Sequence, residues 1–99
     1  MSFVTAQPEA LAAAALTVQA INASSAAADA AAAGPTTSVV PAAADEVSAL
    51  TAAQFAAHAQ MYQAISAQAQ EVQQSFASTL GMSGSSYGFT EAANALATG

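Results

Sequence analysis

The stretch FAAHAQMYQAISAQAQEVQQSF, residues 55–76, decides the fold. Its side chains recur in alternating steps of three and four residues, the spacing of a helix that lies along other helices. The positions in this register are Phe55, His58, Tyr62, Ile65, Ala69, Val72 and Phe76. Upstream, Pro41 and the Asp45-Glu46 pair favour a helix start, and no glycine or proline follows until Gly81. The sequence therefore predicts a helix over residues 41–80, about 60 Å long at 1.5 Å per residue.

Most of these residues, together with apolar neighbours, define the predicted seam. We expect the seam to pack inside a helical hairpin or against a partner. The predicted seam consists of Val47, Leu50, Phe55, His58, Met61, Tyr62, Ile65, Val72, Phe76 and Leu80, with Leu11 and Val18 from an earlier helix.

The earlier helix is predicted over residues 8–33. Pro8 suits a first helical position, where its missing N–H costs nothing, and the Glu9 carboxylate complements the helix dipole. Gly34-Pro35 predicts the stop. The apolar stripe expected on this helix is thin: Leu11, Ala14, Val18 and Ile21.

These elements predict an all-α fold, an antiparallel two-helix hairpin over residues 1–81. The following GMSGSSYG is rich in glycine and serine, which predicts a flexible tail over residues 82–99. One alanine-rich helix offers the other little area to bury, so the hairpin is expected to need a partner that completes a bundle.

Composition excludes several classes of function. The chain has no lysine or arginine and a net charge of −6, which argues against binding nucleic acid or an anionic membrane surface. It has no cysteine, so disulfides and thiolate chemistry are excluded. The N-terminus lacks a basic region, so no cleavable signal peptide is expected. Polar residues interrupt the charge-free stretch 10–28, and no transmembrane helix is expected.

Candidate sites for chemistry are few. His58 is the single histidine, without acids at helical spacing, so a packed residue is expected rather than a metal ligand. The serines form no GxSxG motif, and no enzyme activity, cofactor or small-molecule substrate is expected. Asp45 and Glu46 are expected to cap the second helix. Three apolar residues lie outside the predicted helices: Phe3, Val4 and Phe89. They either dock on a partner or are tail residues without a role, and the sequence leaves both interpretations open.

Three stretches in register resemble the mycobacterial PE family. They are FVTAQPEAL with Pro8-Glu9, the block PTTSVVPAAADEVSALTAAQFAAHAQMYQ, and YGFTE with Tyr87 and Glu91. The resemblance covers essentially the whole chain. It implies a helical hairpin that pairs with a PPE-family protein in a bundle, exported by a type VII (ESX) secretion system without a cleaved signal peptide.

The same resemblance implies roles for residues and partners. Tyr87 and Glu91 match the tyrosine–acid secretion signal that the export machinery reads, and Pro8-Glu9 match the motif that names the family. A cytosolic secretion chaperone would bind the PPE partner rather than this chain. The sequence resembles the group exported by the fifth ESX system, with a secreted or envelope location.

Other classes of function remain as alternatives at this stage. One is a membrane-active or pore-contributing envelope protein that acts with its PPE partner in nutrient uptake, although the glutamines and the absent cations speak against the isolated chain doing this. An ice-binding helix would need regularly spaced threonines, and the threonines here show no such period. A small enzyme would need a catalytic constellation, and none is evident.

Overall fold

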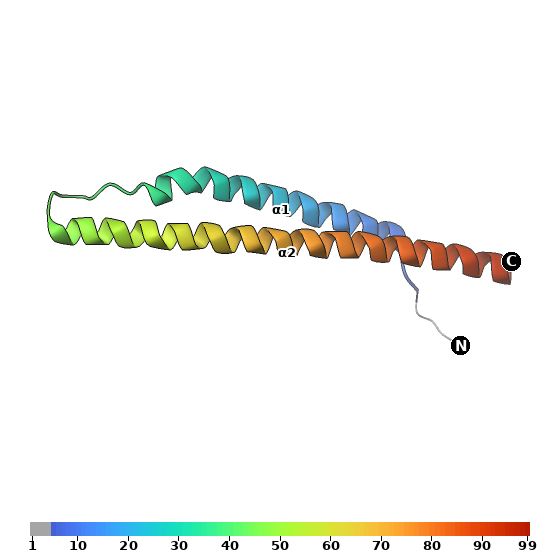
Figure 1. The fold of residues 1–99 in the computed structure, drawn as a ribbon. Helices are drawn as coiled ribbons and strands as arrows, with labels where there is room; N and C mark the ends of the chain where they lie inside the picture. Colours follow the sequence, from blue (N-terminus) through green and yellow to red (C-terminus); the bar gives the residue numbers. More distant parts are fainter. Residues whose placement is uncertain (1–4) are drawn as a thin grey trace. The chain divides into compact units, whose positions relative to one another are not determined.

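Two long helices account for most of the protein. The computed structural model describes residues 5–99, and within them α1 spans Pro8–Thr37 and α2 spans Glu46–Thr98 (Figure 1). A connector of residues 38–45 joins the two helices, and no strand lies within residues 5–99. The prediction of an all-α fold is confirmed. Phe3 and Val4 lie outside the described residues.

The start of α1 is set by Gln7 and Pro8. The Gln7 carbonyl accepts the amides of Ala10 at 3.0 Å and Leu11 at 3.2 Å, so Pro8 occupies the first helical position. Proline has no N–H to leave unsatisfied there, and its fixed φ suits a helix. Glu9 lies in the first turn, next to the positive end of the helix dipole. The predicted start of this helix is confirmed.

The predicted end of α1 at residue 33 is wrong, because the helix continues through Gly34 and Pro35 to Thr37. Pro35 lacks the amide that would bond the carbonyl four residues back, but it lies in the last turn, where few further bonds are lost. Threonine hydroxyls bond neighbouring carbonyls: Thr36 Oγ1 donates to the Ala32 carbonyl and Thr37 Oγ1 to that of Ala33, each at 2.6 Å.

The start of α2 is set by Asp45 rather than Pro41, so the predicted helix start at residue 41 is wrong by five residues. The Asp45 carboxylate accepts the backbone amide of Ser48 at 2.8 Å and its hydroxyl at 3.0 Å. These are the bonds of an N-cap residue, and they satisfy a donor that the first helical turn leaves free. The expected capping role is confirmed for Asp45, and Glu46 lies in the first turn.

The predicted end of α2 at Leu80 is also wrong, because the helix runs to Thr98. Gly81, Gly84 and Gly88 are all helical and none has a positive φ. The sequence reading treated glycine as a helix breaker. Here Gly84 is instead buried against α1, so part of the helical cost of glycine is offset by close packing. Phe89, expected outside the helices, lies within α2.

The chain divides into two compact units, each a pair of antiparallel helical segments. The connector unit is Asn22–Glu71, and the terminal unit combines Met1–Ile21 with Val72–Gly99.

In the connector unit, the residues shielded from solvent are small or polar. Ala52 is buried, and the half-buried residues of its two helical segments are Asn22, Ala26, Asp29, Ala32, Ala33, Thr37, Ser48, Ala56, Ala59, Gln63, Ser66 and Gln70. On α2 these positions follow steps of three and four, so this is a heptad-like seam built from alanine, serine and glutamine. Such residues permit close approach of the helices but bury little apolar area.

In the terminal unit, the covered residues are alanines, glycines and a few aliphatic side chains. Ala15 and Ala77 are the buried apolar residues, with Ala77 only 1% exposed. Leu11, Val18 and Leu80 are half-buried. These three members of the predicted seam therefore do contribute to packing within the chain. In the stripe expected on α1, by contrast, Ala15 takes the place of Ala14, and Ile21 is exposed.

The other members of the predicted seam are exposed in the chain and do not pack inside the hairpin, while the expected packing against a partner stays a prediction. Phe55 is 61% exposed and Phe76 is 57% exposed. The whole set, called here the outward residues of α2, is Val47, Leu50, Phe55, His58, Met61, Tyr62, Ile65, Val72 and Phe76. Small residues form the contact with α1 instead, because they allow a closer approach of two helices than aromatic rings would.

Candidate interaction surfaces

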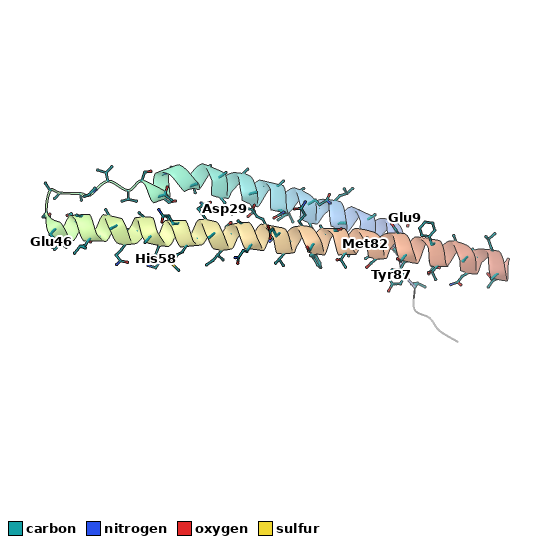
Figure 2. The ribbon with its side chains drawn as sticks, in the orientation of Figure 1. Glu9, Asp29, Glu46, His58, Met82 and Tyr87 are labelled. Atoms are coloured by element: carbon teal, nitrogen blue, oxygen red, sulfur yellow. The ribbon has the colours of Figure 1, made fainter. Side chains whose placement is uncertain are left out.

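A polar cluster around Asp29 joins the two helical segments of the connector unit. Figure 2 shows Asp29 on the side of α1 that faces α2. Its carboxylate accepts hydrogen bonds from the Tyr62 hydroxyl at 2.7 Å, from the Ser66 hydroxyl, and from Gln70 Nε2 at 3.5 Å. The Asp29 backbone carbonyl accepts Gln63 Nε2 at 2.9 Å. Four residues of α2, spread over about two helical turns, thus converge on one residue of α1.

The cluster fixes how these segments pair. An alanine surface looks much the same after a shift of one helical turn, so it specifies register weakly. A shifted Asp29 would lose its donors, and an unpaired carboxylate between helices is costly. Asn22 adds a second polar bridge, since its Nδ2 donates to the Gln70 carbonyl at 3.3 Å. We therefore assign the cluster a structural role, which was not predicted from the sequence.

Hydrogen bonding also perturbs the titration of this pair. The bonds from Ser66 and then Tyr62 lower the pKa of Asp29 below its usual value, because they stabilise the ionised carboxylate. The bond to Asp29 and its negative charge raise the pKa of Tyr62. The hydrogen bonds from Ser48 likewise lower the pKa of Asp45 at the start of α2.

Acid should therefore weaken the connector unit. A carboxylate whose folded pKa is lowered contributes stability above its unfolded pKa of about 3.9, and that contribution is lost as pH falls through the folded value. We expect the thermal midpoint of the wild-type protein, in its most stable isolable form, to drop between about pH 6 and about pH 3. Asp29→Asn should have a lower midpoint at the higher pH and a smaller drop.

Asp45→Asn serves as the matched control, since it removes the other lowered carboxylate without touching the contact between helices. Circular dichroism melts of the three proteins at both pH values provide the measurement. An equal acid-induced drop in wild type and Asp29→Asn would show that Asp29 does not carry the effect.

The outward residues of α2 form the candidate partner surface. In the connector unit they include two aromatic side chains, Phe55 and Tyr62, together with Val47, Leu50, Met61 and Ile65. Exposed apolar residues in such number exceed the single scattered ones that a monomer surface normally carries. In the terminal unit, Val72 and Phe76 are the exposed members.

A shallow apolar groove lies where the connector meets the start of α2. Its volume is about 250 Å³, and it is lined by Val39, Val40, Pro41, Ala42, Val47, Ser48, Thr51, Ala52 and Phe55. Val40 is among the most exposed large apolar residues of the chain. The groove extends the candidate partner surface onto the connector.

His58 lies on a second groove of the connector unit, of about 360 Å³, whose lining also includes Asp29, Tyr62 and Gln63. It is exposed in the chain, so the packing expected for His58 stays a prediction for the complex with a partner. Within residues 5–99, no group of three or more His, Asp or Glu side chains is placed to hold a metal ion.

The tyrosine–acid pair lies in the terminal unit, on the helix rather than on a flexible tail. Tyr87 and Glu91 both belong to α2 and lie four positions apart, about one helical turn. Tyr87 is 50% exposed and Glu91 is exposed. Figure 2 shows Tyr87 on the side of α2 turned away from α1. The pair is therefore presented to solvent on one face of a helix.

One helix meets a simple criterion for membrane-spanning segments. By length and composition alone, α1 is long and apolar enough to cross a bilayer, a criterion that core helices and leader sequences also meet.

Comparison with known proteins matches this sequence to the PE family over residues 4–94. The chain is 64% identical to PE family protein PE13 of Mycobacterium tuberculosis (strain ATCC 25618 / H37Rv) over 97 residues, which cover 98% of each chain. It is 52% identical to PE family protein PE8 of the same strain, covering 98% of this chain and 35% of that protein. The PE-PGRS family protein PE_PGRS33 of that strain is 53% identical over 96% of this chain, which covers 19% of that protein.

Proposed function

The chain belongs to the mycobacterial PE family, and from this premise we propose that it is a non-enzymatic interaction protein that pairs with a PPE-family protein and is exported with it. The fold of α1 and α2 leaves the large apolar residues of α2 uncovered, and this observation carries the proposal. A helical partner laid along α2 would complete a bundle and bury them.

The proposed contact residues are the outward residues of α2. Aromatic side chains dominate binding energy at protein interfaces, so Phe55, Tyr62 and Phe76 are the expected anchors. Leu11, Val18 and Leu80 are proposed to support the helix pairing instead, because they are half-buried between the two segments of the terminal unit.

Export is proposed to depend on Tyr87 and Glu91. An exposed ring and an exposed carboxylate one turn apart give a receptor of a type VII (ESX) system an apolar anchor and a hydrogen-bond acceptor. We assign the chain to the group exported by the fifth ESX system, without a cleaved signal peptide, to the medium or the cell envelope. The secretion chaperone would act indirectly, through the PPE partner.

The test is co-expression with candidate PPE proteins from the same genome, followed by tag purification and light scattering. We expect a stable 1:1 complex with one of them. A panel that includes every PPE protein encoded beside a PE protein, yet yields no complex, would contradict the pairing.

Without its partner, the chain is expected to aggregate or to form non-specific oligomers, because its exposed apolar residues have no cover. Size-exclusion chromatography with circular dichroism on the chain purified alone measures this. A monodisperse monomer with a cooperative thermal transition would show that the helices are self-sufficient.

A second candidate function is a membrane-active or pore-contributing role in the envelope, exercised with the PPE partner in nutrient uptake. The observation that favours it is the length and apolarity of α1. Against it stands Asp29, whose carboxylate is engaged with α2. Leakage of a dye from liposomes, measured with the chain alone and with the complex, separates this function from the first.

A further inference from the structure

The first turn of α1 lies directly on glycines of α2 within the terminal unit. A Cβ added at Gly84 would lie 3.2 Å from the Pro8 carbonyl oxygen, 3.3 Å from Leu11 Cβ and 3.4 Å from the Ala12 nitrogen. A Cβ at Gly88 would lie 3.7 Å from Pro8 Cβ and 4.0 Å from Pro8 Cγ. A Cβ at Gly84 would therefore require the first turn of α1 to shift by a few tenths of an ångström, and the Pro8 ring covers Gly88.

This contact falls inside the tyrosine–acid motif. Gly88 directly follows Tyr87 and precedes Glu91, so Pro8 touches the helix between the two signal residues. Residues 89–99 are all exposed, and the Pro8 contact is thus the last cover that α1 gives to α2 in this unit.

The helix needs that cover. Glycine is about 1 kcal/mol less favourable than alanine inside a helix, and three glycines fall within the eight residues 81–88. A segment of this composition frays unless packing supports it. The packing contact at Gly88, inside the motif, comes from Pro8 in the first turn of α1.

We propose that Pro8 is a positioning residue for export: the first turn of α1 holds residues 84–91 of α2 helical, so that Tyr87 and Glu91 are presented together. The inference rests on the proposed export function. It gives the Pro-Glu motif at the start of α1 a task near the end of α2.

The contact itself is tested by cross-linking, because the chain has no cysteine of its own. The double variant Pro8→Cys with Gly88→Cys places two Cβ atoms 3.7 Å apart, within the range of about 3.5–4.5 Å that disulfides occupy. We expect an intramolecular disulfide in the oxidised, partner-bound chain. Pro8→Cys with Ala92→Cys is the control, since Ala92 lies four residues, about 6 Å, further along α2. No cross-link, or equal cross-linking in the control, would overturn the proposed contact.

The positioning role is tested with Pro8→Gly and Gly84→Leu, the second of which pushes the first turn of α1 away. In both, amide exchange of residues 84–91 is expected to accelerate, and export is expected to fall by about tenfold or more. Co-purification with the partner should persist. Unchanged exchange, unchanged export, or loss of the complex in both variants would overturn the proposal.

A rescue distinguishes positioning from general stability. Gly88→Ala adds a methyl group at ordinary contact distance from Pro8 and favours the helix by about fivefold over glycine. Added to Pro8→Gly, it should restore much of the exchange protection and of the export. If Tyr87→Ala exports normally, the proposed export function fails, while the cross-link and the exchange results still decide whether Pro8 holds the helix.

Discussion

Replacing Tyr87 by alanine is expected to abolish export while leaving the complex with the PPE partner intact. The side chain is half exposed on the side of α2 away from α1, and its removal takes nothing from the buried alanines of the terminal unit. Surface substitutions of this kind usually change stability by about 0.5 kcal/mol or less. A receptor, by contrast, would lose an aromatic anchor, worth about 2 kcal/mol or more at a binding hot spot.

Glu91→Ala should have the same outcome through loss of a charge-assisted hydrogen bond. Thr90→Ala and Asn94→Ala are the controls, because both residues are exposed on the same helical segment but lie outside the motif. Export is measured as the ratio of protein in culture filtrate or envelope to protein in the cytosolic complex. Normal export of both motif variants would sink the signal assignment, and parallel loss of the complex would place Tyr87 in the partner interface.

Phe55→Asp and Phe76→Asp are expected to abolish partner binding without unfolding the helices. Both rings are exposed in the chain, so the substitution leaves the seam with α1 unchanged. In the complex, each would replace an aromatic anchor by a buried, unpaired charge. The loss at such positions is about 2 to 4 kcal/mol, which corresponds to roughly 30- to 800-fold weaker binding.

Matched controls make this prediction specific to one face. Gln60→Asp and Gln74→Asp introduce the same charge at exposed positions of α2, about 140° to 160° around an ideal helix from Phe55 and Phe76 respectively. Co-purification and binding titrations should show weakened binding for the two phenylalanine variants and normal binding for the two glutamine variants. If the glutamine variants lose binding equally, net charge rather than the outward face decides the association.

The presence and type of both helices were predictable, because alanine and the three-four spacing both favour helix. The ends of the helices were less predictable. Gly34-Pro35 and the glycines at 81–88 predict stops when each is judged locally. The structure carries the helices through both: Pro35 lies in the last turn of α1, and Gly84 packs closely against α1.

Hydrophobic periodicity identified an apolar surface of α2, but it did not distinguish packing against α1 from packing against a partner. The register of Phe55, Tyr62 and Phe76 is exposed in the chain, while the seam with α1 follows a parallel register of alanine, serine and glutamine. Such residues carry no hydropathy signal, so the pattern could not reveal the internal contact. Asp29 escaped notice for a related reason, since its donors come from residues more than 30 positions away.

The tyrosine–acid pair could be located from its motif. The sequence did not predict that the pair lies on a helix. The contact between Pro8 and Gly88 joins two motifs 80 residues apart, and nothing in local composition links them. A signal was available in the spacing of Gly81, Gly84 and Gly88, which repeats every three to four residues and so marks one helical face.

The division of α2 into a small-residue side and a large-residue side has an evolutionary consequence. Substitutions at Ala52 or Ala77 are limited by the space next to α1, whichever protein lies on the other side. Substitutions at Phe55 or Ile65 leave that space untouched. A duplicated copy of such a chain can therefore adapt to a new partner by changing one set of residues while it keeps its fold through the other. Among paralogues, we expect the outward positions to diverge in step with the partners and the alanine positions to stay small.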